Sequence, residues 1–476
     1  MLDITTFLCY YCKKHIKNKN ITEMETSFEI IQGGMGVGIS RWYLARTVSM
    51  LGGLGTVSGV ILERVFAHEL QKGDPGGHLR RALAHFPFPG FAEKVLKEYF
   101  VEGGIKHGTP YKMVPLFTVN PSELLICLTI CANFSFVWLA KEGHADPVSI
   151  NYLTKVDMPL IYAITGAMIA GVDYISMGAG LPLQIPKVIN AIAEWETATY
   201  DIKIDGKNIK KYTMSFDPKS FLGTKPLSLS KPSFLPIISS NLLADLLIKE
   251  IGKGNIYGFI VETDRAGGHY ASKKRKMDFA QLAKLGIPFW IGGGTASPEM
   301  LKWARSVGAS GIQVGSIFAL CEESGMNSEI RKKIRQLGFE DKLIIRGDER
   351  ISPSGYSFKV VEMEGTLSQR SVYESRVRIC NHGGFFIPFE RSDGLIGYRC
   401  PAEPINVFKL KFGDIKDTVG RACFCNGLLV TCALGNPGEP PIITLGNDFS
   451  FLKKLMKHRD DTYIAEDAMK YLTAVV

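Results

Sequence analysis

The chain has 476 residues, of which 46% are hydrophobic and 22% charged, a composition that excludes disordered and collagen-like proteins. Its net charge of +9 is spread along the chain, whereas nucleic-acid-binding proteins usually concentrate positive charge, so we expect no nucleic-acid partner. Ten cysteines in so long a chain favour reduced thiols in a cytoplasm over a disulfide scaffold.

The N-terminal segment, residues 1–26, carries its positive charges after a short apolar stretch and lacks a small-residue cleavage site. This order is wrong for a signal peptide, so we expect a leader to the fold. The uncharged run over residues 124–140 has only the minimum length of a membrane span and contains Thr129, Asn133 and Ser135. It therefore predicts a buried helix and no membrane association.

From residue 27 to about 330, short apolar runs that end in Gly, Ser or Asn alternate with longer helical patterns. Most of the runs lack polar alternation, which is typical of parallel strands covered on both faces. Eight such runs with helices between them predict a (β/α)8 TIM barrel in the α/β class, with a doubly wound sheet as the alternative. The expected strands are residues 28–32, 55–58, 148–152, 172–177, 235–239, 257–261, 288–291 and 311–314.

Two insertions and a C-terminal extension interrupt or follow this rhythm. We expect a barrel over residues 27–335, with a first insertion at about 63–112 that is helical and forms a lid or an excursion over the mouth. The second insertion, at about 200–232, contains an alternating segment with an Asp-Gly turn that predicts a β-hairpin. Residues 336–476 have a different texture, basic and glycine-rich, and form the extension.

Glycine is over-represented, at 49 of 476 residues, and glycines cluster after the last two predicted strands. Gly292-Gly293-Gly294-Thr295 follows the seventh run, and Gln313-Val314-Gly315-Ser316 ends the eighth. Bare backbone there lets N–H groups approach an anion, and barrels commonly bind phosphate after these two strands. The sequence therefore predicts a phosphorylated cofactor.

Two other strand ends carry candidate functional residues. Ala266-Gly267-Gly268-His269 follows the sixth run and places an imidazole at the expected mouth, where an ordinary pKa near ~6.5 would allow proton transfer at neutral pH. Gln32-Gly33-Gly34-Met35-Gly36 ends the first run, but its spacing is not that of a dinucleotide-binding loop. A flat backbone beneath a planar ring fits this segment better.

Together these motifs resemble the flavin-dependent nitronate monooxygenase family, formerly called 2-nitropropane dioxygenases, and the related flavin-dependent enoyl reductases. The resemblance covers residues 27–330 and rests on segments 266–269, 291–294 and 311–316 in that order. It implies a TIM barrel that binds FMN, with the phosphate on Gly294, Gly315 and Ser316. His269 would act as a base or position the substrate. The cofactor-binding residues would be Met35, Asn151, Glu262, Gly267, Gly268, Gly293, Gly294, Gln313, Val314, Gly315 and Ser316.

Two residues depart from the pattern of that family. Glu262 stands where many members have Gln, and Arg265 stands where many have Glu. A carboxylate near the flavin would disfavour negative charge on the reduced ring unless it pairs with a base such as Arg265.

Just beyond His269, the basic run 273–276 is either a solvated loop or a patch that attracts an acidic thioester or carrier-protein phosphate.

Through segments 352–356, 364–367, 398–404 and 423–427, the extension also resembles one found in a longer subgroup of these proteins. It contains Cys380, Cys400, Cys423 and Cys425, with the spacing C-x19-C-x22-C-x-C. Four thiolates would suit a zinc ion or an iron–sulfur cluster, but no C-x2-C pair is present, so buried free cysteines are the alternative.

The resemblance implies an FMN enzyme that oxidises alkyl nitronates with O2 to a carbonyl compound and nitrite, without NAD(P)H. The alternative is an NAD(P)H-dependent reductase of enoyl thioesters on the same flavin. In both cases the partner is a small-molecule substrate. A non-enzymatic flavin-binding or metal-binding scaffold is a third hypothesis, and assembly into a homo-oligomer is left open.

Overall fold

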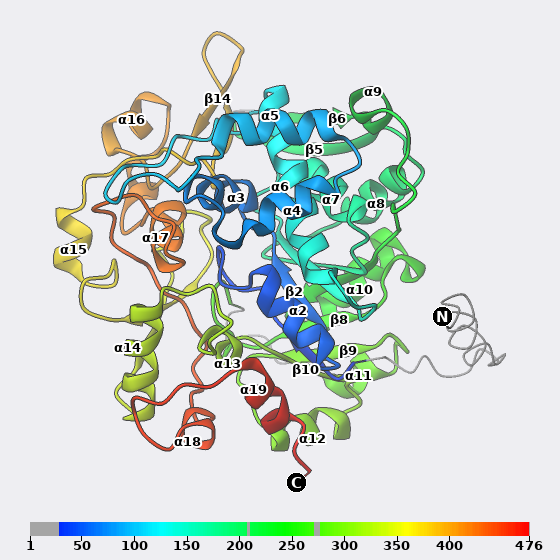
Figure 1. Ribbon diagram of the computed structural model, residues 1–476, viewed down its shortest axis with the longest axis vertical. Coiled ribbons are helices and arrows are strands. Elements are labelled where there is room, and N and C mark those ends of the chain that lie inside the picture. Colours follow the sequence, from blue (N-terminus) through cyan, green and yellow to red (C-terminus); the bar gives the residue numbers. More distant parts are fainter. Residues whose placement is uncertain (1–27, 207–209, 271–276, 476) are drawn as a thin grey trace, which may run out of the picture.

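A barrel of parallel strands forms the centre of the computed structural model, which describes residues 28–206, 210–270 and 277–475 (Figure 1). Its strands pair in the order β1-β10-β9-β8-β7-β4-β3-β2, and every pairing is parallel. Each strand overlaps one of the predicted apolar runs. The strands are β1 (Ile30–Gln32), β2 (Gly55–Ser58), β3 (Val148–Leu153), β4 (Tyr174–Gly178), β7 (Ser233–Ile238), β8 (Phe259–Glu262), β9 (Phe289–Gly292) and β10 (Gly311–Val314).

The barrel closes between β1 and the residue that precedes β2. The Gln32 backbone N–H donates to the carbonyl oxygen of Leu54 at 3.0 Å, and the Leu54 N–H donates to that of Ile30 at 2.8 Å. Because the two ends of the sheet meet in this way, the predicted (β/α)8 barrel is confirmed and the alternative of an open doubly wound sheet is wrong.

A compact apolar cluster fills the amino-terminal end of the barrel. Its buried members include Phe28, Ile31, Ile260 and Trp290, and the rings of Phe28 and Trp290 stack with their centroids 5.1 Å apart. These large side chains leave no room for a ligand at that end, so any cavity inside the barrel has to open at the carboxyl ends of the strands.

Helices between the strands cover the outside of the barrel. The long apolar helix α6 (Glu123–Lys141) packs against α2, α7 and the helices of the first insertion, and 78% of its most apolar 18-residue stretch is buried. Among the described residues it is the one helix long and apolar enough to cross a membrane, but its burial makes it a core helix, as predicted. These helices are α2 (Trp42–Met50), α6 (Glu123–Lys141), α7 (Leu160–Ile169), α8 (Ile185–Ala193), α10 (Asn241–Ile251), α11 (Phe279–Ala283), α12 (Pro298–Ser306) and α13 (Ser316–Ala319), with a 3-10 turn η2 (Lys253–Asn255).

The two predicted insertions contain regular elements. The first has the helices α3 (Leu62–Gln71), α4 (His78–Ala84) and α5 (Pro89–Tyr99) with the 3-10 turn η1 (Pro75–Gly77), which pack on α6. The second has the antiparallel pair β5 (Ala198–Ile204) and β6 (Lys210–Phe216), followed by α9 (Pro218–Leu222). The predicted hairpin is therefore present, although its turn at 207–209 and the predicted leader at 1–26 lie outside the described residues.

The C-terminal extension wraps around one side of the barrel, from α16 at the top of the view to α18 and α19 at the bottom (Figure 1). Helix α19 packs against α2, α12 and α13. The elements of this region are α14 (Ser328–Phe339), β11 (Ile344–Asp348), β12 (Phe358–Glu362), α15 (Arg370–Ser375), β13 (Ile387–Glu390), β14 (Ile396–Arg399), α16 (Ile405–Leu410), η3 (Ile415–Thr418), α17 (Phe424–Thr431), α18 (Leu452–Leu455) and α19 (Ala465–Leu472).

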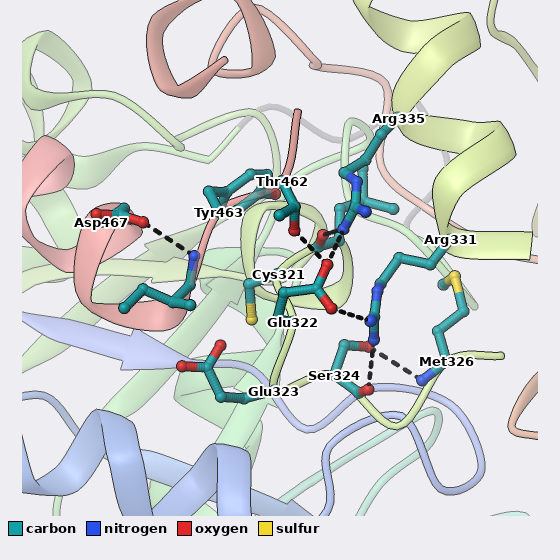
Figure 2. A network of polar contacts seen from close by, with 12 residues as sticks. Cys321, Glu322, Glu323, Ser324, Met326, Arg331, Arg335, Thr462, Tyr463 and Asp467 are labelled. Carbon is teal, nitrogen blue, oxygen red and sulfur yellow. Dashed lines mark hydrogen bonds and ion pairs between the residues drawn. The ribbon is translucent and has the colours of Figure 1, made fainter. Parts of the chain in front are cut away.

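A charged network ties the end of the barrel to this extension (Figure 2). The Glu322 carboxylate pairs with Arg331 Nη2 at 2.6 Å and with Arg335 Nη1 at 2.8 Å, and it also accepts a hydrogen bond from the Thr462 hydroxyl. Both guanidinium groups are nearly buried, so the carboxylate supplies the negative charge that they need.

Candidate active site

A cavity of about 230 Å³ opens at the carboxyl ends of the barrel strands. Its walls come from β3, from the loops after β1, β8, β9 and β10, and from several segments of the extension. Every site residue named from the sequence resemblance borders this one cavity, although their roles there stay predictions. They are Met35, Asn151, Glu262, Gly267, Gly268, His269, Gly293, Gly294, Gln313, Val314, Gly315 and Ser316.

The glycines after β9 are required by the backbone. Gly293 and Gly294 have φ angles of +100° and +70°, a region that other residues rarely adopt. Their N–H groups have no acceptor among the described residues, and the same holds for the N–H of Gly315. Bare backbone with free donors on two adjacent loops is the arrangement that binds phosphate.

Arg265 adds a positive charge to these loops. Its side chain crosses Gly294 so closely that a Cβ added to the glycine would lie 2.5 Å from Arg265 Nε. The guanidinium faces the Asp448 carboxylate at 3.6 Å, and Arg265 does not pair with Glu262. Because half of the Arg265 side chain is exposed, it remains accessible to an anionic ligand at the glycine loops.

Glu262 ends β8 in the wall of the cavity without a partner. No side chain or backbone group in the described part of the chain forms a hydrogen bond or an ion pair with its carboxyl group. Burial away from compensating charge raises the pKa of Glu262 to about 8. At pH 7 the protonated form of Glu262 is therefore favoured, and a neutral carboxylic acid donates one hydrogen bond and accepts another, as the side chain of Gln does.

Asn151 lies within β3 and packs on the flat glycine segment after β1. Its Nδ2 donates to the Gly34 carbonyl oxygen at 3.4 Å, whereas its buried Oδ1 has no partner among the described residues. A Cβ added to Gly34 would lie 2.0 Å from that Oδ1, so only glycine fits there. The Ser40 hydroxyl accepts a hydrogen bond from Met35 N at 2.9 Å and holds the segment in place.

His269 is held between the barrel and the extension. Its Nε2 lies 2.8 Å from Ser352 Oγ and 2.9 Å from Ser354 Oγ, and its ring meets Phe358 edge to face. Burial, together with the nearby charge of Lys155, lowers the pKa of His269 to about 4. The expectation of an ordinary pKa is therefore wrong, and the imidazole is neutral at pH 7.

The extension supplies a wall of the cavity that the sequence analysis did not identify. The Gly268 N–H donates to Thr444 Oγ1 at 2.7 Å, and the Gly446 N–H donates to Ser316 Oγ at 2.9 Å. Further lining residues from the extension are Phe358, Phe385, Phe424, Leu428, Thr431, Leu445 and Asp448. Gly446 and Asn447, residue types common in turns, are the local sequence signal for this contact.

The cysteines of the extension do not form the predicted metal site. Among the described residues, no group of three or more His, Cys, Asp or Glu side chains is arranged to hold a metal ion. Burial raises the pKa of both Cys423 and Cys425, so these are neutral thiols in an apolar environment. The thiols of Cys380 and Cys400 are hydrogen-bonded to each other, and none of the four cysteines forms a disulfide. The prediction of zinc or an iron–sulfur cluster is therefore not supported.

One candidate patch cannot be placed. The basic run 273–276 falls within residues 271–276, which lie outside the described residues. Its proposed attraction for an acidic ligand stays a prediction.

Comparisons with known proteins gave similar folds only. No protein-family model and no curated protein matches the sequence. The structure is similar to that of FabK from Thermotoga maritima, at 15% identity and a TM-score of 0.47, over 94% of this chain and 92% of that one. It is also similar to nitroalkane oxidase from Streptomyces ansochromogenes, at 12% identity and a TM-score of 0.45, over 94% and 95% of the two chains. A third similar structure is the enoyl reductase domain of MlnA from Bacillus amyloliquefaciens, at 15% identity and a TM-score of 0.40, over 71% of this chain and 64% of that one.

Proposed function

We propose that this chain is an FMN-dependent oxidoreductase of the nitronate monooxygenase type. The observation that carries the proposal is that one cavity is lined both by the glycine loops after β9 and β10, which suit a phosphate, and by the flat backbone at Gly33 and Gly34, which suits a planar ring. Free N–H groups at Gly293, Gly294 and Gly315 would hold the phosphate, with Arg265 as the neutralising charge.

The residues on the other side of the cavity fit a planar ring with polar edges. The unpartnered Asn151 Oδ1 would accept a hydrogen bond from it, and the neutral Glu262 would donate one. Gly34 provides flat backbone, and Met35, which lies against Gly315, would cover part of the ring. When bound, FMN supplies the exchange of electrons between substrate and O2.

The protein residues would bind and orient the substrate beside that ring. A nitronate carries its negative charge on oxygen, and the neutral His269 would donate a hydrogen bond to it. Apolar side chains of the extension, among them Phe358 and Phe424, would keep bulk water away from the reacting atoms. The products would be a carbonyl compound and nitrite.

A second candidate is the NAD(P)H-dependent reduction of an enoyl thioester. The aromatic wall that Phe358, Phe385 and Phe424 form with Leu428 favours it, because such a wall suits an acyl chain. His269 would then donate to the thioester carbonyl oxygen. This reaction would use the same flavin site and differ in its electron donor.

Anaerobic visible spectroscopy of the purified protein tests both candidates. A bound flavin with bands in the visible region is expected, and addition of a nitronate should bleach them. Bleaching by NADPH, followed by reoxidation with an enoyl thioester, would instead establish the second candidate. The absence of FMN from the purified protein, together with failure to bind added FMN, would refute the proposal.

A further inference from the structure

His269 and two serines of the extension form a closed triangle of polar atoms. Nε2 lies 2.8 Å from Ser352 Oγ and 2.9 Å from Ser354 Oγ, and the two hydroxyl oxygens are 2.7 Å apart. Ser352 is fully buried, and its carbonyl oxygen accepts a hydrogen bond from Arg421 Nη1 at 2.6 Å. The triangle is therefore fixed on the side of the extension.

The hydrogen bonds that surround the triangle limit where its protons lie. Ser352 Oγ accepts from the Ser354 N–H at 3.2 Å, and Ser354 Oγ accepts from the Tyr356 N–H at 3.4 Å. Neither hydroxyl has another acceptor among the described residues. The protein therefore offers the two hydroxyl protons acceptors only within the triangle itself.

The count of protons favours an unprotonated Nε2. If Nε2 accepts, one serine donates to it and the other serine donates to the first, so both hydroxyl protons are used. If Nε2 instead carries a proton, it donates to one serine, and one of the two hydroxyl protons has no protein acceptor: at Ser352 that proton would be fully buried, and at half-buried Ser354 it would have to point to water. An unsatisfied buried donor costs about 1–3 kcal/mol.

The other ring nitrogen then decides what His269 offers to a ligand. Burial keeps the imidazole neutral, so a ring that accepts at Nε2 carries its single proton on Nδ1. Nδ1 has no protein partner among the described residues, and the ring borders the cavity. Lys155 Nζ, which lies 5.0 Å from the Tyr356 ring centroid, is the charged group nearby that disfavours a second proton.

We propose that Ser352 and Ser354 are positioning residues that fix His269 as the Nδ1–H tautomer, so that it serves as a hydrogen-bond donor to a substrate oxygen. The ligand chemistry it selects is a carbonyl or nitro-type oxygen that gains negative charge during the reaction. The identity of that oxygen rests on the proposed function, whereas the tautomer does not. A neutral histidine that donates in this way has a precedent in triosephosphate isomerase.

Nitrogen NMR of the full-length protein, labelled with 15N-histidine and purified at pH 7, tests this inference. Long-range correlations between ring protons and nitrogens distinguish the two neutral tautomers, and His269→Asn identifies the signals of this residue. We expect the wild type to show Nε2 unprotonated and Nδ1 protonated. In Ser352→Ala/Ser354→Ala the tautomer should no longer be fixed, and signals of the Nε2–H form should appear.

Three further variants separate positioning from general structural damage. Ser354→Thr retains the hydroxyl and should retain the wild-type tautomer. Ser375→Ala, at an exposed serine of the same extension, should leave the His269 signals unchanged. In Ser354→Ala, at a half-buried position, the Ser352 hydroxyl still lies 2.8 Å from Nε2, so this variant should keep the wild-type tautomer. If the double variant does not fold, Ser352→Cys/Ser354→Ala, which replaces the buried hydroxyl by a weaker donor of similar size, provides the comparison.

Two results would overturn the inference: a wild-type His269 with its proton on Nε2, or an Nδ1–H tautomer that persists when the serines are removed. Neither result depends on flavin or on turnover. Failure of the protein to bind FMN would refute the proposed function and leave the tautomer assignment intact.

Discussion

The Gly446 backbone N–H donates to the Ser316 hydroxyl at 2.9 Å and so joins two segments 130 residues apart. Ser316 begins the helix after the last barrel strand, whereas Gly446 belongs to the extension. A chain that ended with the barrel would lack this contact and the wall beside it. We therefore regard the extension as part of the site and expect it to be needed for cofactor binding.

Gly267→Ala should disturb the packing of the extension on the barrel. A Cβ at position 267 would lie 2.7 Å from the Leu445 carbonyl carbon and 2.8 Å from the Gly446 nitrogen, and backbone atoms cannot rotate away. We expect a loss of about 1–3 kcal/mol in the free energy of unfolding and weaker FMN binding. Urea unfolding and quenching of flavin fluorescence measure the two effects.

Gly90→Ala is the matched control for that substitution. A Cβ at Gly90, in helix α5, would meet nothing within 4 Å, so this variant should be as stable as the wild type or slightly more so. Equal stability of the two alanine variants would contradict the close packing of the extension on Gly267.

Local sequence patterns predicted the barrel because its strands are buried apolar runs and its sharp turns need glycine. Gly293 and Gly294 have positive φ angles that favour glycine, which explains why the glycine pattern in the sequence marks this turn. The contacts of the extension left no comparable signal: the Thr444 hydroxyl meets Gly268 N across 176 residues, and no periodicity marks such a pair. The lowered pKa of His269 likewise depends on burial by distant segments, so the residue itself was identified but its proton affinity was not.

Arg265→Ala should weaken the binding of FMN more than that of riboflavin, which has no phosphate. The guanidinium lies against Gly294, at the loops proposed to hold the phosphate. Because it is half exposed, we expect a modest effect, about tenfold in the Kd of FMN at low salt and less at high salt. Titration of the apoprotein with both flavins measures this difference.

Arg370→Ala removes the same charge from an exposed position in α15 and should change neither affinity. An equal loss of affinity for FMN and riboflavin in Arg265→Ala would place the phosphate elsewhere.

Glu322→Gln should destabilise the junction between barrel and extension (Figure 2). It removes the negative charge that Arg331 and Arg335 share, and both of those side chains are at least 92% buried. Since Glu322 itself is partly exposed, water compensates in part, and we expect a loss of about 2 kcal/mol in the free energy of unfolding at pH 7. Urea unfolding of the variant and of Glu374→Gln, an exposed control, measures it.

The effect of Glu322→Gln should also depend on pH. Burial alone would raise the pKa of Glu322. The hydrogen bond from Thr462 and the charges of the two arginines nevertheless hold this pKa below its ordinary value. The carboxylate therefore stabilises the fold above about pH 4.5, and this contribution is lost as the pH falls through the lowered pKa. Wild type and variant should converge in stability at low pH, and a constant difference down to pH 2 would contradict the ion-pair network.

Glu262→Gln should alter the pH dependence of stability in the opposite sense. Because the pKa of Glu262 is about 8 in the folded protein and about 4.5 when unfolded, the unfolded chain loses this proton first as the pH rises. The wild type should therefore lose stability between about pH 4.5 and pH 8, whereas Gln has no proton to lose. The free energy of unfolding of the variant should rise relative to that of the wild type by as much as about 1.4 kcal/mol per pH unit in that window, and less where water in the cavity reaches the carboxyl group.

Glu364→Gln, at an exposed site, should follow the wild-type profile. Since Gln reproduces the donor and acceptor of the neutral acid, Glu262→Gln should retain flavin binding at pH 7, and parallel stability profiles from pH 5 to 8 would show that Glu262 is ionised.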